Sequence, residues 1–314
     1  MRILIYGTGA VGGYFGARLA EAGNEVIFLA RGANLEALRE NGLNLESPKG
    51  NYRVWPIRVT DSTADLTALG LIIVGVKAWQ VPEVARSLPQ VMDAKTRVLT
   101  LQNGVDAPYE VAREVGAERV LGGVAKIIVS AGAPGHIRHL GMEPSITLGQ
   151  LGRPGTSGAP ALIVEALWSA GITVQVADNV ESALWQKLLF IAAMSGAGAV
   201  TRSTIGEIRA LAETRQMLTG VMEEISNVAR AKGVPMEEGI VAKTMAFIDS
   251  LPAGGTASMQ RDLIAGRPSE LEAIVGAVVR AAEASKVEVP VSRFIYSALL
   301  LEERRARIAH GLGK

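Results

Sequence analysis

A glycine-rich segment at residues 7–12 carries the first chemical signal in the sequence. It follows the apolar residues 3–6 and consists of Gly7, Thr8, Gly9, Ala10, Val11 and Gly12. In a G-x-G-x-x-G turn between a strand and a helix, the first glycine permits the tight turn, the second lets the backbone approach a pyrophosphate, and the third lets helix and strand pack closely. The N-terminus of the helix presents N–H groups to the phosphates. The segment therefore predicts a dinucleotide site, although glycine-rich turns also occur for packing alone.

Arg31 bears on which dinucleotide would bind. It ends the second apolar run, and no acidic residue follows it before Glu36. Folds that bind NAD or FAD commonly place an Asp or Glu here for the ribose hydroxyls, whereas an arginine suits the 2′-phosphate of NADP(H). We therefore expect NADPH, the alternative being that Arg31 is an ordinary loop arginine.

The elements that would position these residues follow from the first half of the chain. Helical patterns at 11–22 and 81–88 alternate with apolar runs at residues 2–7, 24–31, 69–77, 96–104 and 119–131. Several runs are continuously apolar, as expected for strands that are covered on both faces. This alternation predicts an α/β fold with a doubly wound parallel sheet, a Rossmann domain. Residues 43–59 instead predict a hairpin insertion that turns around 48–51.

The second half has a different pattern. Residues 135–141, 145–152 and 171–178 resemble antiparallel strands, with a loose segment at 152–160. From Glu181 onward the pattern is helical, with breaks at 232–235, 250–255, 265–268 and 287–290. We expect the charged run at 302–307 to lie on the solvated face of the last helix. The predicted domains are residues 1–179, which would bind NADP, and residues 180–314, which would be all helical.

Composition excludes several function classes. The 314 residues are 48% hydrophobic, carry a net charge of +1 and include no cysteine. Disulfides, thiolate nucleophiles and iron–sulfur ligation are excluded, and neither nucleic acid nor an anionic membrane is an expected partner. The longest uncharged apolar stretch, 188–201, is too short to span a bilayer and predicts a buried helix. The N-terminal apolar run contains too many glycines for a secretory signal, so we expect a cytoplasmic protein.

Metal and serine-hydrolase chemistry find little support. His136 and His139 lie three apart in a predicted strand, which directs them to opposite faces, and His310 lies near the C-terminus. The serines lack a G-x-S-x-G context. We therefore expect no metal site.

Five separated motifs together resemble the ketopantoate reductase (2-dehydropantoate 2-reductase) family. They are the glycine segment with Arg31, VKAWQ at 76–80, LQNGV at 101–105, WQKLL at 185–189 and SMQRDLIAGRPSELE at 258–272. The resemblance covers essentially the whole chain in the same order. It implies a Rossmann domain, a helical C-terminal domain like that of 6-phosphogluconate dehydrogenase, and an NADPH-dependent ketone reduction in a cleft between them.

The resemblance also implies roles for individual residues. Lys77 and Asn103 fall where the family contacts the ribose and nicotinamide end of the cofactor, and both follow predicted strands at the carboxyl edge of the sheet. For Asn103, a simple turn is the alternative. Lys187 matches the catalytic lysine of the family. Such a lysine is needed because reduction of a ketone leaves an alkoxide, which requires a proton donor. A lysine that snorkels to water from the apolar helix is the alternative.

Ser258 and Glu270 match the substrate-side serine and carboxylate of the family. Gly266 and Pro268 separate them, so Ser258 is expected in one helix and Glu270 in the first turn of the next. An acid in a first helical turn also stabilises a helix without any ligand, and this is the alternative for Glu270.

The chain departs from the family pattern at three positions. Well-characterised members carry asparagines that bind ketopantoate, and here those positions are Ile191, Ser195 and, by spacing, Ile205. Ile191 and Ser195 lie four and eight residues after Lys187, on one helical face, and should border the site.

The expected activity is NADPH-dependent reduction of a 2-oxoacid, in the first place 2-dehydropantoate to pantoate for pantothenate and coenzyme A biosynthesis. Lys187 would act as general acid and Glu270 would orient Lys187 or the substrate hydroxyl, while Ser195 and Ser258 would contact the substrate. One alternative is a related reductase for another branched 2-oxo or β-hydroxy acid. Another is a non-catalytic NADP(H)-sensing protein that binds a partner through its helical half. We expect a homodimer through the helical domain.

Overall fold

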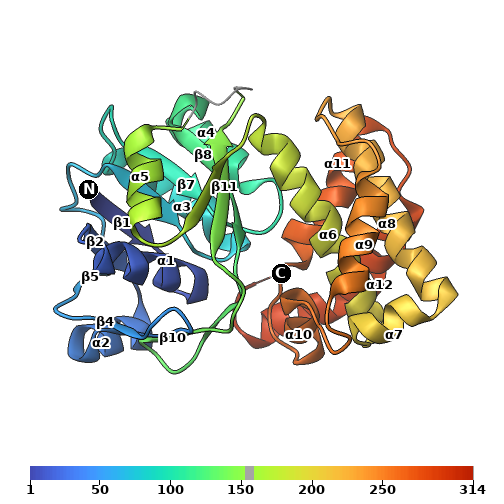
Figure 1. Ribbon diagram of the computed structural model, residues 1–314, viewed down its shortest axis with the longest axis horizontal. Helices are drawn as coiled ribbons and strands as arrows, with labels where there is room; N and C mark the ends of the chain where they lie inside the picture. The colour runs from blue at the N-terminus through green and yellow to red at the C-terminus, as the bar shows by residue number, and fades with distance from the viewer. Residues whose placement is uncertain (153–158, 314) are drawn as a thin grey trace. The chain divides into compact units, whose positions relative to one another are not determined.

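The computed structural model describes residues 1–152 and 159–313, which form two compact units (Figure 1). The first unit contains residues 1–102 and 107–183, and the second contains residues 103–106 and 184–314. Most of the loose segment expected at 152–160 falls at 153–158 and lies outside the described residues.

The first unit is built on a mostly parallel sheet, with one antiparallel pair among its described strands. Among the described residues, the strand order across this sheet is β12 (Thr173–Val176), β11 (Ser145–Gln150), β8 (Val120–Lys126), β7 (Arg97–Thr100), β6 (Leu71–Val74), β1 (Arg2–Tyr6), β2 (Glu25–Leu29) and β5 (Arg58–Thr60). Neighbouring strands from β5 to β8 pair in parallel, in the order of a Rossmann fold. The predicted doubly wound parallel sheet is confirmed, and its direction of winding reverses between β1 and β6.

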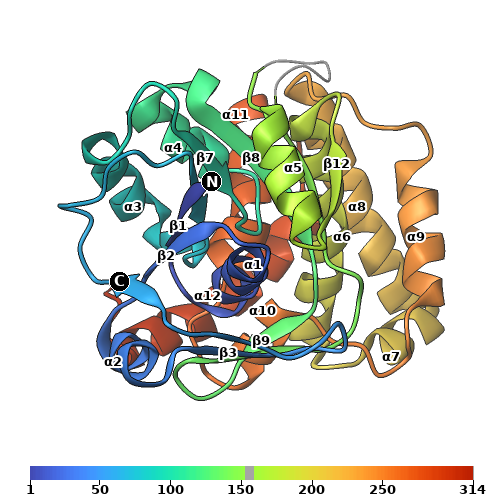
Figure 2. The same ribbon diagram turned by 60° about the vertical axis from the view of Figure 1, so that its left-hand side comes forward.

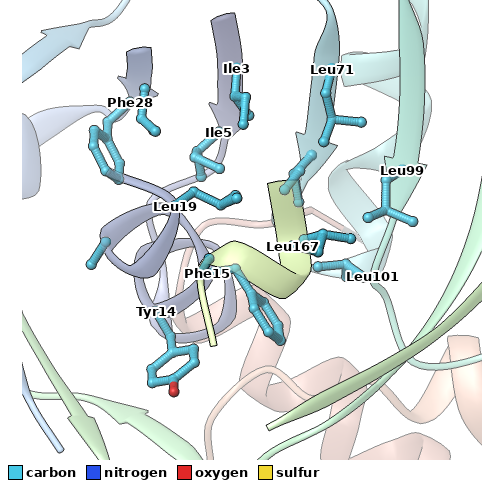
Figure 3. Packing of buried hydrophobic residues seen from close by; sticks show 14 of the residues in the cluster. Ile3, Ile5, Tyr14, Phe15, Leu19, Phe28, Leu71, Leu99, Leu101 and Leu167 are labelled. Atoms are coloured by element: carbon cyan, nitrogen blue, oxygen red, sulfur yellow. The ribbon is translucent and has the colours of Figure 1, made fainter. Parts of the chain in front are cut away.

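Helices cover both faces of this sheet, which explains the continuous apolar runs. Ile3, Ile5, Leu71 and Leu99 pack on one face with Phe15 of α1 (Ala10–Glu21) and Leu167 of α5 (Ala161–Ser169) (Figure 3). The alternate residues, among them Leu4 and Ile72, pack on the other face with α3 (Val81–Ser87) and α4 (Ala107–Val115). Each strand therefore buries two successive side chains on opposite faces.

A smaller sheet contains the predicted hairpin. Its strand order is β4 (Tyr52–Val54), β3 (Leu43–Glu46), β10 (His136–His139) and β9 (Val129–Ala131). Strands β3 and β4 pair antiparallel on either side of residues 47–51, as predicted. The end of the expected hairpin segment is different, because β5 pairs in parallel with β2 in the larger sheet.

Two further expectations for this unit are wrong. The run at 119–131 forms two strands in different sheets, β8 and β9, rather than one. Strand β12 pairs in parallel with β11 rather than antiparallel. Helix α5 lies between β11 and β12 in the chain, and such a crossover returns the chain to the end of the sheet from which it started. The remaining short helices of the unit are α2 (Gly32–Asn41), η1 (Ala78–Gln80), η2 (Leu88–Gln90) and η3 (Ala117–Arg119).

The second unit is helical, as predicted. Its helices are α6 (Val180–Thr201, whose first turn belongs to the first unit), α7 (Ile205–Ala210), α8 (Ala212–Ala231), α9 (Ile240–Ser250), α10 (Ser258–Ile264), a π-helix (Glu272–Gly276) that continues into α11 (Ala277–Ser285), and α12 (Pro290–Ala309). The four predicted breaks all fall between helices. Helix α8 packs against α9, α11 and α12. Figure 2 shows α9 beside α8.

Helix α6 contains the apolar stretch 188–201 and is longer than that stretch. Within the described part of the chain it is the one helix that is long and apolar enough to cross a membrane, but 61% of its most apolar stretch is buried. It is therefore a core helix, as predicted.

The charged run at 302–307 is not wholly on a solvated face. Glu303 is 1% exposed, and Arg307 forms an ion pair with it inside the unit. The expectation is wrong for these two residues because they lie on the inward face of α12, four residues apart.

Candidate active site

The glycine segment forms a turn that is closed backbone against backbone. Gly7 has a φ of +101°, and a Cβ on Gly12 would lie 2.1 Å from the carbonyl oxygen of Gly7. A Cβ on Gly75, directly after β6, would lie 2.9 Å from the Cα of Gly12. The ends of β1 and β6 and the start of α1 therefore meet without intervening side chains, at the switch point where Rossmann folds bind ligands.

The centre of this turn fits a pyrophosphate. Gly9 is the N-cap residue of α1, makes no side-chain capping bond, and has no atom within 4 Å of the place that a Cβ would take. Ala10 and Val11 begin the helix and are partly exposed. Among the described residues no side chain caps this first turn, so its backbone N–H groups can receive a phosphate.

Thr8 and Asn34 hold the turn from behind. The buried Thr8 hydroxyl donates to the carbonyl oxygen of Leu29 at the end of β2, over 3.0 Å. The amide of Asn34 on α2 donates to the Thr8 carbonyl oxygen, also over 3.0 Å. The side chain of Thr8 is therefore engaged with the sheet, and Asn34 is a supporting residue that the motif did not reveal.

Arg31 is the N-cap residue of α2 and follows the end of β2. Its guanidinium pairs with the carboxylate of Glu83 on α3 at 3.3 Å, and both side chains are more than 60% exposed. An exposed pair of this kind is weak, so the guanidinium can exchange partners at little cost.

Lys77 follows β6 and is held through its backbone. Its N–H donates to Oε1 of Gln80, and its ammonium lies 5.8 Å from the centre of the Trp79 ring. The buried Gln102, at the end of β7, donates through Nε2 to the carbonyl oxygens of Val74 (2.8 Å) and Val76 (3.0 Å). Gln102 therefore fixes the turn that carries Lys77, although sequence reasoning assigned it no role.

The second unit brings two of the predicted site residues into contact. Nδ2 of Asn103 donates a hydrogen bond to Oε2 of Glu270 at a distance of 2.9 Å. Glu270 is buried and directly precedes the helix that begins at Leu271, and its carbonyl oxygen accepts from the N–H groups of Ala273 and Ile274. The carboxylate is thus directed at an amide 167 residues away in the chain.

The neighbours of Asn103 are also fixed within this unit. Gly104 has a φ of +95°, and a Cβ there would lie 2.3 Å from the carbonyl oxygen of Ala273 in the π-helix. Asp106 forms an ion pair with Arg280 at 2.9 Å. Residues 103–106 are therefore anchored to the segment that follows Glu270.

The π-helix carries its own polar contacts. The carboxylate of Glu272 accepts from the Tyr296 hydroxyl over 2.8 Å and pairs with Arg280 at 3.1 Å. Burial and this hydrogen bond raise the pKa of Tyr296 to about 12. Single-turn π-helices are common at functional sites, where they redirect the residues beside them.

The remaining predicted residues of this unit differ in exposure. Lys187 is partly exposed on α6, whereas Ser195, two turns later on the same face, is only 2% exposed. Ile191 between them is partly exposed. Ser258 is exposed at the first position of α10, and Ile205 is 1% exposed at the start of α7.

The histidines of β10 point to opposite faces, as predicted, with His136 exposed and His139 buried. The ring nitrogens of His139 lie 2.9 Å from the Ser47 hydroxyl and from the Met142 carbonyl oxygen. No group of three potential metal ligands occurs among the residues that the structure describes.

Comparison with known proteins identifies the family. The family described as "Ketopantoate reductase PanE/ApbA" matches residues 3–153. The family that describes its C-terminal domain matches residues 179–303. The chain belongs to the ketopantoate reductase PanE/ApbA family. The chain is 32% identical to the 2-dehydropantoate 2-reductase of Mesorhizobium japonicum, and the match covers 88% of this chain and 90% of that protein.

Solved structures agree with this assignment. The PanE/ApbA family ketopantoate reductase from Ralstonia eutropha is 28% identical, with a TM-score of 0.88 over 98% of this chain and all of that one. D-mandelate dehydrogenase, solved with NADH and anilino(oxo)acetate, has a TM-score of 0.86 over 96% of this chain and 98% of that one. Its 23% identity shows a shared fold alone.

The family membership confirms the resemblance inferred from the five motifs. The chain is an oxidoreductase that acts on CH–OH groups, in a family of nicotinamide-dependent reductases of 2-oxoacids. The alternative of a non-catalytic sensor therefore loses its basis.

Proposed function

We propose that the protein reduces 2-dehydropantoate to pantoate with NADPH, as a step towards pantothenate and coenzyme A. The observation that carries this proposal is the hydrogen bond from Asn103 to Glu270. It joins the amide that the family places at the nicotinamide end of the cofactor to the carboxylate that the family places beside the substrate. A cofactor contact and a substrate contact would thus share one location.

The cofactor would be held mainly by backbone and by cations. The open first turn of α1 at residues 7–12 would receive the pyrophosphate, Arg31 the 2′-phosphate, and Lys77 and Asn103 the ribose and nicotinamide end. NADPH supplies the hydride when bound. Gln102 and Asn34, through the contacts described above, would keep the two turns that carry these residues in place.

Lys187 would hold the proton that the reaction consumes. The carbonyl oxygen of the substrate gains negative charge as it is reduced, and an ammonium group within hydrogen-bond reach can both stabilise that charge and donate the proton. Glu270 would orient Lys187 or the substrate hydroxyl, since a carboxylate accepts hydrogen bonds from either group. Ser195 and Ser258 would contact the substrate.

The substrate range is the part of the proposal that depends on this chain rather than on the family. Ile205 is buried and packs close to Gly255, so its side chain belongs to the hydrophobic core of the unit. Ile191 is partly exposed on the face that carries Lys187, and it would present hydrocarbon where relatives have an amide. We infer a preference for a less hydroxylated acyl chain than that of ketopantoate, with a shifted ketopantoate pose on Ser195 and Ser258 as the alternative.

The test is a panel of 2-oxoacids assayed by NADPH oxidation. It includes ketopantoate, the analogue that lacks the 4-hydroxyl, and other branched 2-oxoacids. Turnover of at least one 2-oxoacid is expected, and an inactive panel would remove the proposed function. A kcat/KM for ketopantoate more than about a hundredfold above that of the deoxy analogue would show that the site still binds the hydroxyl, against the inferred preference.

Two further expectations accompany this function. A homodimer through the helical unit is expected, and light scattering of the purified protein would measure its mass. We also expect the protein in the cytoplasm, and fractionation of cells that express a tagged chain would check this.

A further inference from the structure

A buried carboxylate binds the residue that precedes Glu270 in the sequence. Glu303 on α12 is 1% exposed, and its Oε2 accepts from the N–H of Ser269 at 3.0 Å and from the Ser269 hydroxyl at 2.5 Å. Its Oε1 accepts from Nε of Arg307 at 2.6 Å. Ser269 is itself fully buried and directly precedes Glu270.

These contacts hold Ser269 on three sides. Glu303 binds its N–H and its hydroxyl, while Nη2 of Arg307 lies 3.4 Å from its carbonyl oxygen. The Ser269 hydroxyl oxygen also accepts from the N–H of Leu271 over 3.2 Å. The residues on both sides of Glu270 are therefore fixed, which leaves the Glu270 backbone little freedom.

A buried charge is costly unless hydrogen bonds and an opposite charge compensate for it. Glu303 has both, but a neutral side chain could fill the same space with less desolvation. The arrangement concentrates its strongest hydrogen bonds on the residue before Glu270, since bonds to ionised groups are shorter and stronger than neutral ones. Holding a reacting group in place is a use that would balance this cost.

We propose that Glu303, with Arg307, is a positioning residue for Glu270. It touches neither substrate nor cofactor in this proposal and acts through Ser269 to direct the Glu270 carboxylate, which then meets Asn103. The inference rests on the proposed function, in which Glu270 serves the reduction.

The chain contains a matched comparison. Glu224 on α8 is also buried, and its carboxylate accepts from the N–H of Val291 at 2.7 Å, the N–H of Ser292 at 2.8 Å and the Ser292 hydroxyl at 2.6 Å. It fixes the start of α12 by the same chemistry that Glu303 applies just before the helix that begins at Leu271. Ser292 does not neighbour any residue of the proposed site in the sequence, and it precedes Glu303 by three helical turns.

The experiment compares Glu303→Gln with Glu224→Gln in the full chain. Glutamine keeps the shape and one acceptor oxygen but loses the charge. Both variants should lose thermal stability to a similar extent. We expect Glu303→Gln to lower kcat about tenfold or more, because small misplacements of a reacting group are costly, while Glu224→Gln keeps kcat within about twofold of the wild type.

A double-mutant cycle separates positioning from general destabilisation. If Glu303 acts through Glu270, Glu303→Gln should have no further effect on kcat in a Glu270→Gln background. Additive losses, or a kcat for Glu303→Gln within twofold of that for Glu224→Gln, would overturn the proposal. Should either glutamate variant fail to fold, Ser269→Ala against Ser292→Ala makes the same comparison, with Ser269→Thr expected to restore kcat.

Hydrogen exchange of the cofactor-free chain provides a readout that does not depend on activity. Glu303→Gln should speed exchange in residues 267–276, and Glu224→Gln in residues 288–294 instead. Unchanged exchange at 267–276 would overturn the proposal even if the activity falls. A wild-type chain that reduces no 2-oxoacid would remove the proposed function, and the exchange comparison would still decide whether Glu303 orders the segment that carries Glu270.

Discussion

Replacing Arg31 by alanine should weaken NADPH binding far more than NADH binding. In the structure the guanidinium pairs with the exposed carboxylate of Glu83 at 3.3 Å. Such a pair contributes about 0–1 kcal/mol, so Arg31→Ala should hardly change the free energy of unfolding. Charge-assisted hydrogen bonds to a 2′-phosphate are worth about 1.5–3 kcal/mol, which corresponds to about one to two decades in the NADPH dissociation constant. NADH has no 2′-phosphate and should lose little.

Glu83 makes the prediction sharper, because its carboxylate competes for the same guanidinium and would repel the phosphate. Glu83→Gln should therefore tighten NADPH binding, by no more than about 1 kcal/mol or fivefold, and leave NADH unchanged. Both effects should shrink as salt rises. Arg39 supplies the control, since it lies on the same helix and forms a similarly exposed pair with Asp61 at 3.6 Å.

The assay is a fluorescence titration of each variant with NADPH and with NADH at two salt concentrations. Arg39→Ala should behave as the wild type with both cofactors. Equal losses for NADPH and NADH in Arg31→Ala, or an Arg39→Ala variant that loses as much NADPH affinity, would refute the assignment of Arg31 to the 2′-phosphate.

Three other predictions concern the proton donor, the glycine turn and a tyrosine. Lys187→Ala should bind NADPH normally but lose about two decades in kcat, and near-normal turnover would favour a lysine that only snorkels to water. Gly12→Ala should lower both the melting temperature and NADPH affinity, because its Cβ would lie 2.1 Å from the Gly7 carbonyl oxygen. Gly9→Ala, which has open space at that place, should lose affinity alone, and equal melting-temperature losses would contradict this. Tyr296 has its pKa raised to about 12 from an ordinary value near 10, so the stability it adds is present below pH 10 and falls as pH rises to 12. Between pH 10 and 12 the free energy of unfolding of Tyr296→Phe should fall less than that of the wild type, as measured by denaturation. An identical fall would contradict the assignment.

Local patterns were sufficient to predict the core of the fold. Continuous apolar runs such as residues 71–74 indicate strands buried on both faces, and the glycine motif indicates which strand begins the series. The patterns failed where pairing depends on distant partners. Nothing in residues 173–176 distinguishes a parallel from an antiparallel neighbour, and residues 119–131 do not show where the chain leaves one sheet for the other.

The candidate site shows the same limit. Asn103 and Glu270 each come from the resemblance to the family, but their hydrogen bond joins residues 167 positions apart and only the fold reveals it. Gln102 could have been noticed, because an amide at the end of a buried apolar strand needs partners there. Glu303 could not, since an alternation of acids and arginines near the end of a helix more often indicates a solvated surface.

The assignment of residues 103–106 to the helical unit has a consequence for building hybrids with relatives. A crossover at the boundary near residue 180 would seem to exchange one intact unit for another. It would instead take Asn103, Gly104 and Asp106 from one parent and their partners Glu270, Ala273 and Arg280 from the other. A hybrid should therefore inherit this tetrapeptide together with the helices, and two relatives that differ there should recombine poorly even when each half is well formed.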